Sequence, residues 1–353
     1  MLSDFVERVK RKNKNNLCKL PLTISAQYGL VDQISFFNKV IASENMSNYY
    51  LLHKGDFAYN KSYSSEYPWG AIKRLDCYEQ GTLSSLYICF KPYSHVSSDF
   101  LTHYFETSKW HQGISEIAVE GARNHGLLNV GIQDFFETRH CLPQSLLEQE
   151  KIAKFLNLIE ERIATQNKII EKLQSLIKGL AVALTTKEKA NIAISQCLEC
   201  HSSTLQESEV LSSGLCKVFG ANGLVGYKDV PQMNGDAILV IKDGSGVGTV
   251  SYAQGKFSVI GTLNYLTVIG NNDLRYLYFA LSVFNFQPYK TGMAIPHIYF
   301  KDYGKAKIYC PSLAEQKRVA NVLDKLESKL FVEQELLASF NQQKLYLLGK
   351  MFI

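Results

Sequence analysis

The sequence lacks the signals that would place the chain in a membrane or in a secreted, disulfide-bonded class. No apolar run approaches the roughly 18–20 residues that cross a bilayer, and the polar, basic stretch from Met1 to Lys14 is followed by no apolar core. The sequence has no secretion signal, and its 8 cysteines in 353 residues therefore indicate thiols rather than a disulfide framework. We therefore expect a cytoplasmic protein with no membrane partner.

Proline is also infrequent, and neither charge is in large excess. The 8 prolines and 23 glycines form no low-complexity tract, which excludes collagen-like and disordered classes. Lys and Arg number 38 against 33 Asp and Glu, so the formal charge of +5 is too small to identify a nucleic-acid binder. The length alone predicts two or three domains with sizeable cores.

Catalytic and metal-binding signatures are missing as well. No G-x-S-x-G, no H-E-x-x-H and no Asn-Pro-Pro-aromatic or Asp-Pro-Pro-aromatic tetrapeptide occurs. The glycine-rich segment Asp243–Gly248 lacks the spacing of a phosphate-binding loop and is interpreted as a hairpin turn. Cys197-Leu-Glu-Cys200-His201 matches a haem-attachment pattern, but attachment of that kind belongs to exported proteins, which this chain does not resemble. A zinc site would need two more ligands, so we interpret the match as coincidence. We predict no enzyme active site, no metal and no cofactor in this chain.

What the sequence does contain is an internal repeat. Short phrases recur in the same order at offsets that fall steadily from 194 to 167, which is typical of two copies whose second member has lost loop residues. The matched phrases are Ala26–Val31 with Gly220–Val225, Gly81–Leu83 with Gly261–Leu263, and Ser145–Leu146 with Ser312–Leu313.

The first part of each copy, residues 1–142 and 191–310, has short runs rich in Tyr, Phe, Val and Ile between Gly, Asn and Asp. Ala237–Ile241 and Leu86–Phe90 are examples, and such runs indicate strands joined by turns. Because helical segments such as Leu274–Phe284 interrupt them, the predicted class is α+β.

The second part of each copy, residues 143–190 and 311–353, is predicted to be a long helix. Ser145 with Glu148, and Ser312 with Glu315, have the spacing of a capping box. Apolar residues then alternate at spacings of four and three, a coiled-coil pattern along roughly 55 Å of helix. Each helix could pack on its own domain, but we favour packing of the two seams on each other or on partner helices. The seam residues are Ile152, Leu156, Ile159, Ile163, Ile170, Leu173, Ile177, Val319, Leu323, Leu326, Leu330, Leu337 and Phe340.

Each seam is interrupted once by a polar residue, Gln166 in the first helix and Glu333 in the second. A polar residue at a shared seam position favours one register at some cost in stability.

Polar and aromatic residues recur on glycine-containing loops in both copies. Amide, Arg and Lys side chains pair with the edges of DNA bases, although the same residue types also serve as ordinary turn residues. The candidate DNA-binding residues are Gln27, Tyr28, Tyr59, Asn60, Lys61, Arg74, Arg123, Asn124, Asn222, Lys242, Ser245, Thr291, His297 and Lys301.

At the start of each long helix the sequence resembles a known family. The phrases Leu142-Pro143-x4-Glu148-Gln149-x-x-Ile152-Ala153-x-x-Leu156 and Pro311-x3-Glu315-Gln316-x-x-Val319-Ala320-x-x-Leu323 resemble those of the specificity (S) subunits of type I restriction-modification systems. The resemblance covers essentially the whole chain. It implies two target-recognition domains, each reading one half of a bipartite, asymmetric site on double-stranded DNA. The two helices would form an antiparallel coiled coil that sets the spacer.

The resemblance also implies partners. Two methyltransferase (M) subunits, which carry S-adenosylmethionine, would dock on this non-catalytic scaffold, and restriction (R) subunits with ATP and Mg²⁺ would join them in phage defence. Many family members have extra N-terminal residues, so we interpret Met1 as the start of a shortened form, and the contacts to one M subunit are the part of the resemblance that this departure puts in doubt. The alternative is a coiled-coil interaction scaffold without DNA-sequence preference.

Overall fold

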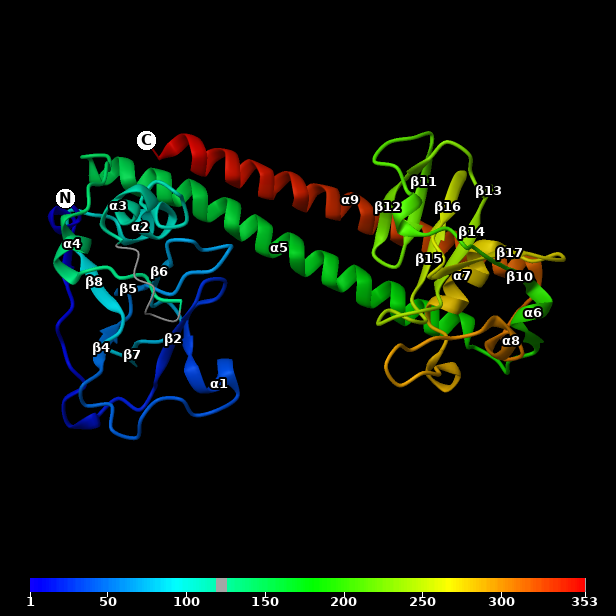
Figure 1. Cartoon of the computed structure of the whole chain (residues 1–353), viewed down its shortest axis with the longest axis horizontal. Coiled ribbons are helices and arrows are strands. Elements are labelled where there is room, and N and C mark those ends of the chain that lie inside the picture. The colour runs from blue at the N-terminus through cyan, green and yellow to red at the C-terminus, as the bar shows by residue number, and fades with distance from the viewer. Residues whose placement is uncertain (119–125, 353) are drawn as a thin grey trace. The chain divides into compact units, whose positions relative to one another are not determined.

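The computed structural model describes residues 1–118 and 126–352, and the chain divides into two compact units (Figure 1). The first unit comprises Met1–Thr165 with Leu337–Ile353, and the second comprises Gln166–Leu336. Each unit thus contains one strand-rich part and a portion of each long helix. None of the helices in the described ranges has the length and apolar character needed to span a membrane.

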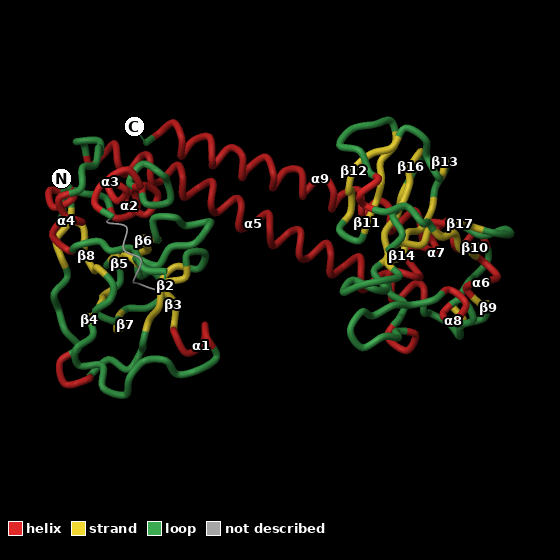
Figure 2. The backbone as a smooth tube through the Cα atoms, viewed as in Figure 1, coloured by secondary structure: helices red, strands yellow, loops and turns green. Residues whose placement is uncertain are grey.

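The first unit is built on short antiparallel strands. Its largest sheet has the order β1-β8-β5-β6, and β2 pairs with β3 and β4 with β7. Short helices accompany the strands in the part of this unit that the structure describes (Figure 2). The elements are β1 (Val6–Arg8), β2 (Leu22–Ser25), β3 (Gly29–Asp32), α1 (Gln33–Phe37), β4 (Tyr50–His53), β5 (Phe57–Asn60), β6 (Ala71–Arg74), β7 (Gln80–Leu83), β8 (Ile88–Pro92), α2 (Ser98–Tyr104), α3 (His111–Ile117) and α4 (Ile132–Glu137).

The second unit repeats this topology. Its sheet β10-β17-β14-β15 corresponds strand by strand to the sheet β1-β8-β5-β6 of the first unit. The pair β11–β12 corresponds to β2–β3, and the pair β13–β16 corresponds to β4–β7. The α+β class is therefore confirmed. The elements are β9 (Ile192–Ala193), α6 (Ile194–Cys197), β10 (Leu198–Ser202), β11 (Cys216–Gly220), β12 (Gly223–Lys228), β13 (Met233–Asn234), β14 (Ala237–Ile241), β15 (Val250–Ala253), β16 (Lys256–Val259), β17 (Leu263–Val268), α7 (Leu274–Ser282), α8 (Phe300–Tyr303) and β18 (Lys307–Ile308).

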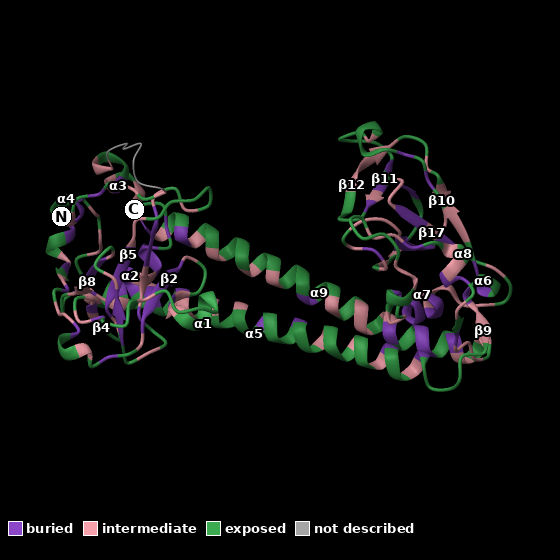
Figure 3. Ribbon diagram, turned by 60° about the horizontal axis from the view of Figure 1, so that its bottom comes forward, coloured by how far each residue is buried: buried purple, intermediate pink, exposed green. Residues whose placement is uncertain are grey.

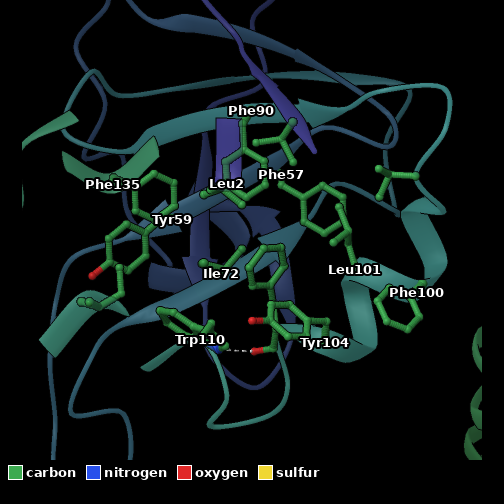
Figure 4. Close-up of a cluster of buried hydrophobic side chains, with 14 of the residues drawn as sticks. Leu2, Phe57, Tyr59, Ile72, Phe90, Phe100, Leu101, Tyr104, Trp110 and Phe135 are labelled. Atoms are coloured by element: carbon green, nitrogen blue, oxygen red, sulfur yellow. Dashed lines mark hydrogen bonds between the residues drawn. The ribbon is translucent and has the colours of Figure 1, made fainter. Parts of the chain in front are cut away.

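An aromatic core holds the first unit together (Figure 4). The Phe57 and Phe90 rings stack with centroids 5.5 Å apart, and the buried Trp110 indole donates a hydrogen bond to the Phe105 carbonyl at 3.0 Å. The same core includes Leu156 of the first long helix. Because burying large aromatic side chains is a main source of stability, this part of the helix is fixed to its domain.

In the second unit, Arg275 of α7 fastens the domain to the second long helix. Its guanidinium donates to Asp324 at 2.6 Å and to Glu327 at 2.7 Å, and it lies 4.3 Å from the centre of the Tyr252 ring. Charge-assisted hydrogen bonds combined with a cation–π contact orient a guanidinium strongly. Leu323, which is fully buried, adds the apolar part of the junction.

The two long helices are α5 (Leu146–Thr185) and α9 (Leu313–Met351), of 40 and 39 residues, and they pack together. In the first unit they run antiparallel, since Glu160 pairs with Lys344 and Arg162 lies over Phe340. Buried and half-buried positions alternate with exposed ones along both helices (Figure 3). Among the predicted seam residues the buried ones are Leu156, Ile159, Ile170, Val319 and Leu323, and the half-buried ones are Ile152, Ile163, Leu173, Ile177, Leu326, Leu330, Leu337 and Phe340.

One buried glutamine in each copy joins a long helix to its domain. The Gln149 side chain accepts a hydrogen bond from the Ser97 amide and donates one to the Pro143 carbonyl, both at 2.8 Å. Gln316 makes the same pair of bonds at the same lengths, with the Asp273 amide and the Pro311 carbonyl. Because each glutamine is only 2% exposed, these groups satisfy one another away from water.

Gln166 and Glu333, which interrupt the two seams, meet inside the helix pair of the second unit. The Gln166 amide donates to the Glu333 backbone carbonyl at 3.0 Å and also to its carboxylate. The other carboxylate oxygen pairs with Lys329, one turn away on α9. Since both seam residues are almost buried, at 5% and 7% exposure, their contact disfavours any helix register that would leave either one unpaired.

This contact predicts a pH dependence of stability. Lys329, and after it Gln166, lowers the pKa of Glu333 below the ordinary value of 4.5. A carboxyl whose folded-state pKa is depressed adds stability above its unfolded pKa and loses it as the pH falls through the folded value. We expect Glu333→Gln to flatten the decline in thermal midpoint below about pH 4.5.

The control for this measurement is Glu335→Gln, which changes an exposed carboxylate on the same helix. Thermal midpoints at pH 7, 5.5 and 4 would be compared for the two variants and the parent chain. Equal pH profiles for all three would exclude the Gln166–Glu333–Lys329 contact as a stabilising ion pair.

Candidate nucleic-acid interface

Two loops lie side by side in the second unit, residues 242–248 and 291–297, and are called the paired loops. The Ile298 amide donates to the Lys242 carbonyl and the Gly244 amide to the Pro296 carbonyl, both at 2.9 Å. Thr291 and His297 exchange backbone hydrogen bonds of 2.9 and 2.8 Å, which closes the second loop on itself. The first loop joins β14 to β15, so its predicted interpretation as a hairpin turn is confirmed.

The first unit contains the same arrangement. The Leu128 amide donates to the Lys61 carbonyl at 2.9 Å, and the Tyr63 amide donates to the Gly126 carbonyl at 3.1 Å. Ser62 forms an antiparallel β-bridge with Leu127, as Asp243 does with His297 in the second unit. These matching bonds make Lys61 the structural equivalent of Lys242. The first unit therefore has its own paired loops, of which residues 60–63 and 126–128 are described.

Glycine at position 292 is required by the shape of its loop. Its φ is +88°, and a Cβ there would lie 2.3 Å from the Ile295 carbonyl oxygen and 2.9 Å from the His297 ring. Any residue other than glycine is strained at this φ, and its Cβ would clash with these atoms. The turn at Gly292 is thus tight, and the residues that follow it, Met293 and Ile295, are exposed to solvent.

Four predicted DNA-binding residues are brought together on the paired loops of the second unit. The side chains of Ser245 and Thr291 are exposed, and that of Lys242 is partly exposed, with its Nζ 3.9 Å from an Asp243 carboxylate oxygen. The His297 ring is half-buried and lies edge-on to the Tyr299 ring at 5.1 Å. Donors of three chemical types therefore share one rim.

Two further candidates of the second unit lie outside the paired loops. Lys301 is exposed on α8, with its Nζ 5.1 Å from the centre of the Tyr299 ring. Asn222 is exposed at the turn between β11 and β12, and the structure records no contact between it and the paired loops.

In the first unit, Gln27 and Tyr28 occupy the corresponding turn between β2 and β3, where the Tyr28 side chain is 64% exposed. Asn60 and Lys61 are half-buried, and the side-chain Oδ1 of Asn60 accepts a hydrogen bond from the Ser62 backbone amide at 3.0 Å. The predicted residues Arg123 and Asn124 lie outside the described residues.

Two predicted DNA contacts are not supported by the structure. Tyr59 is fully buried, stacks on Phe135 at 5.0 Å and donates its hydroxyl proton to the Trp69 carbonyl, and burial raises its pKa. Arg74 is held by Asp76 and Asp99, each at 2.6 Å. A core tyrosine and an arginine already paired with two carboxylates are poorly placed to contact bases. The positions of Tyr59 and Arg74 on strands do not reveal that one is buried in the core and the other paired with carboxylates.

Some exposed residues of the paired loops were not among the candidates. Tyr63 is 52% exposed beside Gly126, and Met293 and Ile295 form the tip of the Gly292 loop. Met293 and Ile295 could have been found from the sequence, because both lie within three residues of the loop glycine Gly292, whereas Tyr63 meets Gly126 only through the folded structure.

The chain is similar to proteins of one family. The model of the type I restriction modification DNA specificity domain matches residues 201–342. The specificity subunit of the type I restriction enzyme EcoprrI from Escherichia coli is 24% identical over 110 residues, which are 31% of this chain. The match spans about a quarter of that relative, 27% of its length.

Solved structures extend the likeness in fold to the whole chain. The type I restriction-modification S subunit from M. genitalium superposes with a TM-score of 0.65 at 16% identity, covering 100% of this chain and 95% of that one. A chain from a structure that describes complex assembly and conformational transition of a type I system superposes with a TM-score of 0.59 at 15% identity, covering 99% and 95%. The family model, the curated relative and the fold of the solved structures agree, and all of them show that the chain is similar to the specificity subunits of type I restriction-modification systems.

Proposed function

We propose that the chain is the non-catalytic subunit that reads a bipartite, asymmetric DNA target. Residues 1–142 and 191–310 are the two target-recognition domains, one for each half-site. The paired loops carry this proposal, because the same hydrogen bonds join them in both units while their side chains differ. A repeated frame with different polar groups suits the reading of two different half-sites.

The chemistry of the loops fits base and phosphate contacts. Lys61 and Lys242 start equivalent loops, and a lysine can donate to guanine O6 and N7 or to a phosphate. Ser245, Thr291 and His297 add shorter side chains beside Lys242. In the first unit, Gln27, Asn60, Arg123 and Asn124 are the proposed partners of the bases.

The long helices, residues 143–190 and 311–353, form the antiparallel coiled coil that fixes the spacer between half-sites. The contact between Gln166 and Glu333 supports a defined register, which a molecular ruler requires.

The same helices offer a surface for partner subunits. Both α5 and α9 carry apolar side chains that the helix pair leaves exposed. Large exposed apolar patches mark interaction sites on proteins. Two M subunits with S-adenosylmethionine dock there, and R subunits with ATP and Mg²⁺ complete the complex. The exposed residues are Leu147, Phe155, Leu158, Ile169, Leu176 and Val182 of α5, and Val322, Phe331, Val332, Leu336, Leu345 and Tyr346 of α9.

The test is to map methylated sites in cells that express this chain with its M subunits. We expect Lys61→Ala to weaken or relax one half-site only and Lys242→Ala to do the same for the other, each by roughly tenfold or more, because a good base contact contributes about 1–3 kcal/mol. Lys189→Ala, an exposed lysine after α5, is the control.

The opposite outcomes are equally definite. Equal weakening on every sequence by both variants would assign the two lysines to phosphates rather than to bases. An absence of any sequence preference, with M subunits bound, would favour the alternative of an interaction scaffold.

A further inference from the structure

The tip of the second unit's paired loops is apolar and fully open to solvent. Met293 has a relative exposure of 104% and Ile295 of 67%. These side chains add nothing to the core, and leaving apolar surface in water brings no stability. Two such side chains beside the polar residues of the paired loops suit a ligand that offers an apolar group at one point.

The tip is rigidly supported, so its exposure is a property of the loop's shape. Thr291 and His297 close its base by two hydrogen bonds, the Pro296 carbonyl accepts from Gly244, and the positive φ of Gly292 sets the turn. A preformed loop loses little conformational entropy on binding, so a small apolar contact made by its tip contributes most of its free energy to affinity.

The charges around the tip favour a polyanion. Lys242, Lys290 and Lys301 lie on or directly beside the paired loops, against the two carboxylates of Asp243 and Asp302. Lys301 is exposed and Lys290 is half-buried. Lysines at the margin of a loop tip can hold the phosphates on either side of the bases that the tip contacts.

The two copies differ at this point in what they offer the bases. Aligned through their matching hydrogen bonds, Met293 and Ile295 correspond in the sequence to Arg123 and His125 of the first copy. Arg123 and His125 lie outside the described residues, but their side chains are hydrogen-bond donors, whereas those of Met293 and Ile295 are apolar. In the major groove the apolar feature of a base edge is the C5-methyl group of thymine.

We propose that Met293 and Ile295 recognise thymine in the second half-site by packing against its C5-methyl group. This inference rests on the proposed function, since it names a base contact of the same DNA-reading surface. The neighbouring lysines bind the flanking phosphates and so hold the tip in the groove. The contact is specific because cytosine and the purines lack this methyl group.

The experiment measures binding of the chain with its M subunits to duplexes of the mapped target by fluorescence anisotropy. Each thymine of the second half-site is replaced in turn by deoxyuridine, which removes only the methyl group. We expect at least one replacement to weaken binding roughly fourfold, the effect of burying about one methyl group. Replacements in the first half-site are the internal control.

Two variants connect that effect to the tip. Met293→Ser with Ile295→Ser should bind thymine and deoxyuridine duplexes equally, whereas Met293→Leu with Ile295→Val should keep the discrimination. Val230→Ser, at an exposed apolar residue that is 76% accessible elsewhere in the unit, is the matched control. Since all these side chains are exposed, unchanged thermal midpoints are expected and would be checked for each variant.

Several results would overturn the inference. The proposed contact with the thymine methyl group would be excluded if the second half-site contains no thymine. It would also be excluded if every deoxyuridine duplex binds as well as the parent duplex. A strong rise in 2-aminopurine fluorescence next to the tip, lost in the serine variant, would mean that the tip separates stacked bases instead. If the complex shows no sequence preference at all, the proposed function itself fails, which a specific but methyl-independent complex would not imply.

Discussion

Removing seven residues from each long helix should shorten the spacer of the methylated site and leave both half-site sequences unchanged. The deletions are residues 167–173 of α5 and 326–332 of α9, which keep the seam spacing on both sides of Gln166 and Glu333. They also remove Glu327 and Lys329, so that Arg275 keeps Asp324 as its carboxylate partner on α9. Seven residues of helix are about 10 Å long, which corresponds to at most about three base pairs at 3.4 Å each. Methylome sequencing would give the new spacer directly.

The control for this ruler is a deletion of residues 167–173 alone. It removes one side of the helix pairing and brings apolar seam residues of α9 opposite the wrong partners, so we expect loss of the folded subunit rather than a new spacer. An unchanged spacer in a folded, active double deletion would refute the ruler. In that case the M subunits, not the helices, would set the distance between half-sites.

Truncating the leucine that joins each long helix to its domain should strongly destabilise that unit. Leu156 and Leu323 occupy equivalent positions, are fully buried, and belong to the cores of the first and second units. Replacing a buried leucine by alanine costs about 2–5 kcal/mol, depending on how far the site collapses. Leu156→Ala should therefore loosen the first unit and Leu323→Ala the second.

Hydrogen exchange read out by peptide in increasing urea would assign each loss to one unit, which a single unfolding curve of two units cannot do. Leu158→Ala and Val322→Ala, at side chains 50% and 45% exposed on the same helices, should cost about 0.5 kcal/mol or less. Equal losses at the core and surface positions would contradict the view that these leucines fix the helices to their domains.

Local patterns were sufficient to predict the repeat and the two long helices. The helices begin at Leu146 and Leu313, directly after the serines predicted to cap them. A helix depends on residues three and four apart, so its apolar stripe can be recognised from the sequence. The recurrence of eight strands in the same order also follows from the repeat, since two copies of one sequence pattern form the same topology.

The candidate site was only partly predictable, because side-chain burial in a sheet depends on distant residues. Tyr59 and Asn60 are neighbours on β5, yet Tyr59 packs on Phe135 in the core while Asn60 faces the loop side. Arg74 looked free in the sequence, but the carboxylate of Asp99, 25 residues later, holds it. No periodicity reveals partners so far apart.

The sequence by itself determined the class, the duplication and the helical seams, since each of these depends on residue spacing along one chain. Only the tertiary structure decided which loops lie together: Lys61 with Leu128, and Lys242 with Ile298. It also decided that Gln166 meets Glu333 and that Met293 extends into solvent. These contacts join segments tens to hundreds of residues apart, and they form only when the packing of whole domains brings those segments together.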